Sequence, residues 1–150
     1  MIEYSWYNLG MAIKDLKAET HKLYKSVGSM WCRAVKNNVV FNKYGWVHLS
    51  FERGGKRRRP RDLKLRHHLF QYVHEIVGRC RVMIEKEGTV KSKRGVVRKV
   101  KYYELVYWCK AEKRHISVIL RRIEEGNLHY YSVRRASNRI KKALQKAGLL

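Results

Sequence analysis

The sequence predicts an α+β fold: a long N-terminal helix, then a twisted antiparallel sheet of four to five strands with helices packed on one face. Three observations lead to this prediction. Apolar residues near the N-terminus recur every three or four positions, which is typical of a helix. Four later segments alternate apolar and polar residues and are separated by short turns, as in antiparallel strands. The 150 residues, 45% of them apolar, suffice for one core, so we expect a helical segment over residues 1–40 and a single α+β domain over residues 41–150.

The N-terminal helix is expected to begin after Ser5, a residue type that caps helices. Its apolar or small positions follow a heptad spacing: Trp6, Leu9, Ile13, Leu16, Thr20, Leu23, Val27, Met30 and Ala34. A helix over residues 6–36 would be about 45 Å long at about 1.5 Å per residue, which is longer than a small sheet needs. Two interpretations stay open. The helix lies along its own domain, with a break near Gly28, or residues 6–34 bind a second copy of the chain or a neutralising protein.

The middle of the chain reads as a strand, a basic loop and a second helix. The segment GWVHLSF, residues 45–51, alternates as a strand does. Residues 54–61 form a loop in which two glycines precede a dense run of Lys and Arg. We expect this loop to grip phosphate groups, because glycine lets a backbone approach a ligand closely. A helix capped by Asp62 then runs to about Val77, and Gly78 ends it.

The remainder of the chain reads as an antiparallel meander closed by a helix. Strands are expected over residues 81–86, 96–109, 114–123 and 128–135, with turns at Gly88, 110–113 and 124–127. A helix over residues 137–147 follows, with Ile140, Ala143, Leu144 and Ala147 turned inward.

Short turns set the register of these strands, so their side chains can be assigned to faces. We pair Cys109 with Arg114 and Ile123 with Leu128. One face then carries the core: Tyr103, Leu105, Tyr107, Ile116, Val118, Leu120, Tyr131 and Val133. The open face mixes charged, hydroxyl and aromatic groups: Tyr102, Glu104, Val106, Trp108, His115, Ser117, Ile119, Arg121, Tyr130, Ser132 and Arg134. Such a face suits RNA, because Arg binds phosphate and rings stack on unpaired bases, although polar residues point outward on any half-buried sheet.

The charge of the chain indicates the class of partner. It carries 35 Lys and Arg against 12 Asp and Glu, a formal net charge of +23. Because like charges destabilise a compact domain, this excess points to a polyanionic partner, most simply nucleic acid. A membrane surface or an acidic protein would also neutralise this charge. Three scattered cysteines indicate a reducing compartment, and the N-terminal residues do not read as a signal peptide. We therefore expect a cytoplasmic protein that binds RNA or the ribosome, with no membrane span.

Cleavage of RNA without a metal needs a base for the 2′-OH, a cation beside the phosphate and an acid for the leaving oxygen. Glu104 is the acidic side chain that the register places on the open face, so we expect it to be the base. Arg121 and Arg134 would hold the phosphate. The acid could be His48, on the outward phase of the first strand, or His115. The structural alternatives are that Glu104 pairs with a nearby arginine and that His48 is an ordinary surface histidine.

Further loop and open-face residues are expected to bind nucleic acid: Lys56, Arg57, Arg58, Arg59, Arg61, Tyr102, Trp108, His115 and Arg135. The histidines at 67, 68 and 74 lack the spacing of metal ligands. The sequence contains no glycine-rich nucleotide-binding motif and no serine-hydrolase motif. We therefore expect neither a metal nor a cofactor.

The order of the expected elements carries a resemblance over residues 44–135. A strand at residues 46–51 precedes a helix ending Glu75-Ile76-Val77-Gly78 and a meander finishing HISVILRRIEEGNLHYYSVRR. This order resembles the superfamily that groups barnase, EndoU, colicin-type and RelE-like nucleases, especially its phage- and plasmid-borne toxins. The resemblance implies RNA cleavage without metal on the open face of a four- or five-stranded sheet, and often a partner protein that holds the nuclease inactive. The comparable outward strand positions are Glu104, Arg121, Tyr130, Ser132, Arg134 and His48.

The sequence thus predicts a metal-independent endoribonuclease of toxin or effector type. Two alternatives stay open. One is a non-catalytic RNA- or DNA-binding protein that uses the same basic face. The other is a basic protein that inhibits a nucleic-acid-handling complex by binding one of its proteins.

Overall fold

The computed structural model describes residues 12–52 and 54–150 and has an α+β fold, which confirms the predicted class. One sheet of six strands, more than the four or five expected, runs in the order β1-β2-β6-β5-β4-β3. Neighbouring strands are antiparallel except β2 and β6, which pair in parallel. The strands are β1 (Ser29–Cys32), β2 (Asn37–Val40), β3 (Met83–Lys91), β4 (Val97–Cys109), β5 (Arg114–Ile123) and β6 (His129–Arg135).

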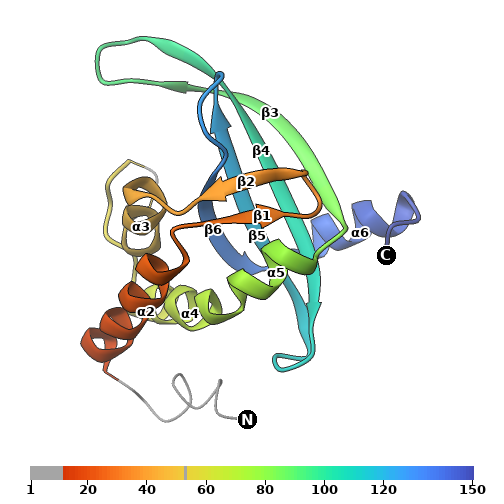
Figure 1. Cartoon of the computed structure of the whole chain (residues 1–150), viewed down its shortest axis with the longest axis horizontal. Helices are drawn as coiled ribbons and strands as arrows, with labels where there is room; N and C mark the ends of the chain where they lie inside the picture. Colours follow the sequence, from red (N-terminus) through yellow and green to blue (C-terminus); the bar gives the residue numbers. More distant parts are fainter. Residues whose placement is uncertain (1–11, 53) are drawn as a thin grey trace.

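Helices cover both faces of the sheet (Figure 1). The helices are α2 (Ile13–Val27), α3 (Lys43–Ser50), α4 (Pro60–Leu69), the 3-10 turn η1 (Phe70–Tyr72), α5 (Val73–Arg79) and α6 (Asn138–Lys146). Those from α2 to α5 lie with the main core on one side. Helix α6 packs on the opposite side, where Ile140 and Leu144 cover Val106. Ala143 and Ala147 are exposed, so their predicted inward orientation is wrong.

The N-terminal helix is shorter than the expected span of residues 6–36. It ends at Val27, and Gly28, with a φ of 63°, turns the chain into the hairpin of β1 and β2. The expected break near Gly28 is therefore confirmed, while residues 29–36 are not helical; residues 6–11 lie outside the described part of the chain. Leu16 and Thr20 of the heptad spacing are buried and α2 packs against α4, so this stretch of the spacing marks a contact within the domain.

Residues 43–50 form helix α3, and the strand predicted over residues 45–51 is wrong. The side chain of Asn42 caps this helix by accepting a hydrogen bond from the backbone N–H of Tyr44. Gly45 and Leu49, one helical turn apart, are buried together. An alternating pattern of only seven residues fits a strand or a helix. Here the Asn42 cap and the burial of residues four apart favour the helix.

The expected register of β4 and β5 is confirmed. Cys109 pairs with Arg114 across the turn, and Glu104 pairs with Ile119. Strand β3, predicted over residues 81–86, instead runs to Lys91, so Gly88 lies within the strand and not in a turn. Residues 85–87 are all charged and Val90 is the one large apolar residue beyond them, so the outer half of β3 gives little strand signal; it pairs with a largely exposed part of β4.

A β-bulge between β5 and β6 changes which tyrosine faces the core. Ser117 pairs with Arg134 as expected, but the register shifts beyond Ile119, so Leu120 pairs with Tyr130 and not with Tyr131. The side chain of Tyr130 is completely buried. The predicted outward position of Tyr130 and the predicted inward position of Tyr131 are therefore both wrong.

Replacing Gly45 by alanine is expected to destabilise the protein by about 1–3 kcal/mol, the usual effect of overpacking a core. The new Cβ would lie less than 3.0 Å from the carbonyl oxygen and the ring of Tyr130 and from the hydroxyl of Tyr24. Gly78→Ala is the matched control, because its Cβ would lie at an ordinary 3.5 Å from Met30. Urea unfolding measures both variants. Equal stability of the two would contradict this packing of α3.

The buried histidine His67 is expected to make stability fall in acid. Its side chain is 1% exposed, and burial, with a smaller contribution from Lys17, lowers its pKa to about 4. His67 therefore binds a proton near pH 6.5 in the unfolded chain but only near pH 4 in the folded chain. As the pH decreases through this window, the free energy of unfolding decreases by at most about 1.4 kcal/mol per pH unit from this group. Urea unfolding between pH 7 and pH 4.5 measures this dependence. His67→Gln should reduce it, and His74→Gln, which changes an exposed histidine, should not. Identical pH dependence of the wild type and His67→Gln would contradict the lowered pKa of His67.

Candidate functional site

The open face of the sheet, opposite the main core, holds a pocket of about 220 Å³. Strands β3 to β6 form it, and α3 and α4 each add one side chain. The pocket brings together five predicted site residues: His48, Tyr102, Glu104, Ser132 and Arg134. The structure adds residues that the sequence analysis did not select: Arg66, Ile84, Lys86, Ile119 and Tyr131.

Glu104 lies at the base of this pocket and is only 4% exposed. One of its carboxylate oxygens, Oε1, accepts a hydrogen bond from Nη2 of Arg134 at 3.3 Å. The other, Oε2, is buried and has no hydrogen-bond partner among residues 12–52 and 54–150. The Arg134 side chain is half exposed, so it can contact a ligand and the carboxylate together. An acceptor with a free oxygen beside a cation is the arrangement that proton abstraction next to a phosphate requires.

His48 reaches the pocket from helix α3, although the sequence analysis placed it on a strand. Its ring stacks on Tyr131, with centroids 4.2 Å apart and planes 16° from parallel. Arg58 donates to the backbone oxygen of His48 at 3.0 Å and to its Nε2 at 3.2 Å. Because arginine only donates hydrogen bonds, Nε2 must accept, and the ring proton lies on Nδ1.

The surroundings of His48 keep its imidazole neutral at pH 7. Burial is the main cause that lowers its pKa to about 4, followed by the positive charges of Arg58, Arg66 and Arg121. The Asp62 carboxylate opposes this shift. A general acid must carry a proton at the working pH, so the acid role expected of His48 does not fit the free protein.

A network of charges ties α4 to the sheet. Asp62 accepts hydrogen bonds from Arg58 at 3.0 Å and from Arg66 at 3.1 Å. Arg66 also donates to Oγ of Ser132 at 2.5 Å and to the backbone oxygen of Val133 at 3.2 Å. The Arg58 side chain is 5% exposed, so it supports His48 from within, whereas it was expected to grip nucleic acid. The other basic residues of the loop are exposed: Lys56, Arg57, Arg59 and Arg61.

Arg121 lies beside the pocket and does not line it. Its guanidinium carbon sits 4.4 Å from the centre of the Tyr131 ring, and its Nε donates to Nε2 of His129 at 3.0 Å. The Tyr131 ring therefore contacts both the imidazole of His48 and the guanidinium of Arg121. The ring of Tyr102 is a third neighbour, with its centroid 5.7 Å from that of Tyr131.

Three further predicted residues, Trp108, His115 and Arg135, also lie apart from this pocket. The rings of Trp108 and His115 contact each other at 5.1 Å, and neither lines the pocket. Lys141 of α6 is one cause that lowers the pKa of His115, after burial. Arg135 is exposed at the end of β6. Lys86 was not among the predicted residues, although the register of β4, extended to β3, pairs it with Tyr102.

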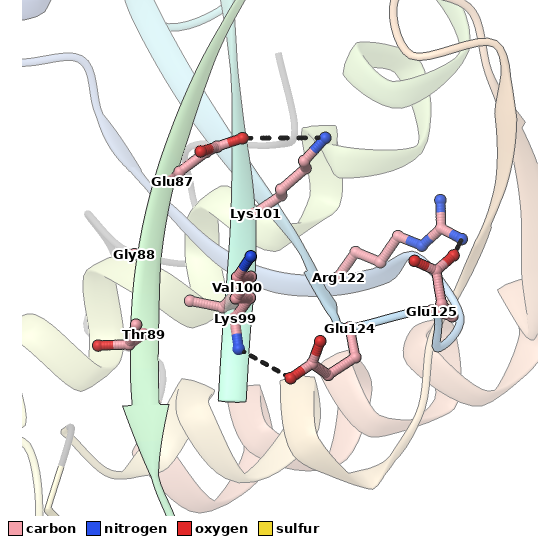
Figure 2. Close-up of a pocket in the computed structure, with 9 residues that line it drawn as sticks. All are labelled: Glu87, Gly88, Thr89, Lys99, Val100, Lys101, Arg122, Glu124 and Glu125. Atoms are coloured by element: carbon pink, nitrogen blue, oxygen red, sulfur yellow. Dashed lines mark hydrogen bonds and ion pairs between the residues drawn. The ribbon is translucent and has the colours of Figure 1, made fainter. Parts of the chain in front are cut away.

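A larger hollow of about 690 Å³ lies at the far end of β3, β4 and β5 (Figure 2). Four of its six charged side chains form ion pairs: Glu87 with Lys101 at 4.0 Å and Arg122 with Glu125 at 3.4 Å. Glu124 accepts from the backbone N–H of Lys99 at 3.0 Å. Three acidic and three basic residues line it, so its charge is balanced. The smaller pocket on the open face, with its excess of arginines, is the better site for an anion.

Comparison of the sequence with protein-family models, with curated proteins and with solved structures finds no match. Within residues 12–52 and 54–150, no three His, Cys, Asp or Glu side chains are grouped to hold a metal ion. The same residues include no helix with both the length and the apolar character to cross a membrane. The function is therefore inferred from the geometry of the pocket.

The ring of His48 is expected to titrate near pH 4. In Arg58→Gln the pKa should rise, because the nearest cation and the donor to Nε2 are both removed. Arg57→Gln, which changes the exposed neighbouring arginine, should leave the midpoint in place. NMR titration of the histidine ring protons, assigned with His48→Asn, measures each pKa. A wild-type midpoint near 6.5 would contradict the Arg58 contact.

Proposed function

We propose that this protein is a metal-independent endoribonuclease of toxin or effector type that cleaves RNA, free or in the ribosome, in the pocket around Glu104. The observation that carries the proposal is the buried carboxylate in a pocket whose other charged groups are cations. On a surface that only holds RNA, a carboxylate at this point weakens the attraction, because it repels phosphate. A nuclease needs such a group to take a proton.

In the proposed reaction Glu104 accepts the proton of a ribose 2′-OH, and the 2′ oxygen attacks phosphorus while the bond to the 5′ oxygen breaks. The products are a 2′,3′-cyclic phosphate and a free 5′-OH. Arg66 and Arg134 stabilise the negative charge that develops on the phosphoryl oxygens. The leaving oxygen takes its proton from Lys86 or Tyr102, which are cross-strand neighbours at the pocket and carry transferable protons.

His48 has a supporting role in this proposal. It is neutral at pH 7, and its Nε2 is occupied by Arg58, so its available donor is Nδ1–H. Stacked on Tyr131, it forms one wall of the pocket. We assign the shape of this wall to His48 and the proton transfers to Glu104 and its neighbours.

One observation favours the non-catalytic alternative. Glu104 accepts a hydrogen bond from Arg134, and such a pair alone would also account for a buried carboxylate. In an RNA-binding protein the pair would hold Arg134 in place for a phosphate contact. The two functions differ in what happens when the carboxylate is replaced by an amide of the same shape.

Glu104→Gln is expected to reduce RNA cleavage by about 10²- to 10⁴-fold, the usual contribution of a general base. Binding should not weaken, because glutamine keeps an acceptor for Arg134 and removes a negative charge. Purified protein is incubated with total RNA in EDTA, and 2′,3′-cyclic ends are quantified. Glu87→Gln, the same change in the distant hollow, is the control.

Two outcomes would count against the nuclease. Wild-type protein that binds RNA and leaves it intact supports the non-catalytic alternative. Cleavage that continues at the full rate in Glu104→Gln removes this carboxylate from the mechanism.

A further inference from the structure

Helix α3 exposes an apolar stripe beside the pocket that the proposed reaction does not use. Tyr44 is 58% exposed and Val47 is 51% exposed. Residues three and four apart share one face of a helix, so Tyr44 and Val47 lie on the face that sends His48 into the pocket. Tyr44 is thus one helical turn, about 5.4 Å, from the pocket wall.

A continuous series of contacts joins Tyr44 to the pocket. Its ring lies 6.1 Å from that of His129, and Nζ of Lys43 is 5.7 Å from the ring centre. His129 accepts a hydrogen bond from Arg121, whose guanidinium covers Tyr131 at the pocket. The Nη groups of Arg121 have no hydrogen-bond partner within the described part of the chain, so they can receive a phosphate.

The other rings near the pocket are less suited to stack on a ligand. Tyr131 is half-buried and already contacts His48 and Arg121, Tyr130 is completely buried and Tyr102 is half-buried. Tyr44 therefore offers the most open aromatic surface next to the site. Lys43 and Arg121 are the cations nearest to this ring along the series of contacts. An aromatic ring beside cations suits a nucleotide, whose base stacks and whose phosphate is negatively charged.

We propose that Tyr44, Val47 and Arg121 form a subsite for the nucleotide that adjoins the scissile phosphate. The unpaired base stacks on Tyr44 and contacts Val47, and the phosphate of this nucleotide pairs with Arg121. A base inside a duplex cannot be reached in this way, so the subsite selects single-stranded RNA. The inference rests on the proposed function for the position of the scissile phosphate.

The test measures binding without cleavage, in the Glu104→Gln background. Fluorescence anisotropy is recorded with a labelled RNA hexamer, the same hexamer with one abasic position at each site in turn, and the corresponding duplex. Tyr44→Ala is expected to weaken single-strand binding by about 10-fold, with duplex binding unchanged, and Tyr44→Trp to retain affinity. One abasic position should cost the same factor in the parent protein and nothing further in Tyr44→Ala.

Trp31→Ala is the matched control, because Trp31 is 57% exposed on β1 and lies apart from the pocket. It should leave single-strand affinity unchanged. The subsite is overturned if Tyr44→Ala keeps full affinity, or if it weakens single-strand and duplex binding equally. Failure of the nuclease is seen separately, as intact RNA with the wild-type protein, and the subsite then stands or falls on the anisotropy data alone.

Discussion

The backbone of α3 meets Tyr130 at a distance that leaves room for glycine alone at position 45, and much of the site follows from this contact. Tyr130 stacks on Phe41 in the core, with ring centroids 5.4 Å apart. Because Tyr130 points inward, the β-bulge turns the next residue, Tyr131, to the open face. Helix α3, held beside β6, then lays His48 on that ring. One packing contact in the core thus positions two walls of the pocket.

The second constraint is electrostatic and centres on Asp62. Two arginines, Arg58 and Arg66, have side chains that are 5% and 16% exposed, and Asp62 pairs with both. Burying two cations so close together is costly unless a shared anion compensates them. With Asp62 in place, Arg66 can reach Ser132, and Arg58 can hold His48. The same cations lower the pKa of His48, so the structural network also sets the charge of the pocket.

The elements that could be predicted from the sequence are those with strong local signals. The register of β4 and β5 was predictable because a short turn and long alternation leave one pairing, and this placed Glu104 correctly. The bulge that exchanges Tyr130 and Tyr131 follows from packing under α3, which no local pattern records. His48 was predicted on a strand because a short alternating segment fits either a strand or a helix. In the structure it reaches the pocket from helix α3. Arg66 was missed because its role depends on a contact with Ser132, 66 positions away.

The net charge of +23 acquires a more specific meaning in this arrangement. Exposed cations on the loop at residues 54–61 would attract any polyanion without distinguishing one from another. Helix α6 covers the part of the open face around Val106. The part that carries the pocket lies next to α3 and is not covered by α6. There the cations are few, two of them, Arg66 and Arg134, are held by hydrogen bonds, and they lie around one carboxylate. In the proposed nuclease, attraction and chemistry would therefore belong to different residues, and Glu104 would be the group whose charge opposes binding and favours proton transfer.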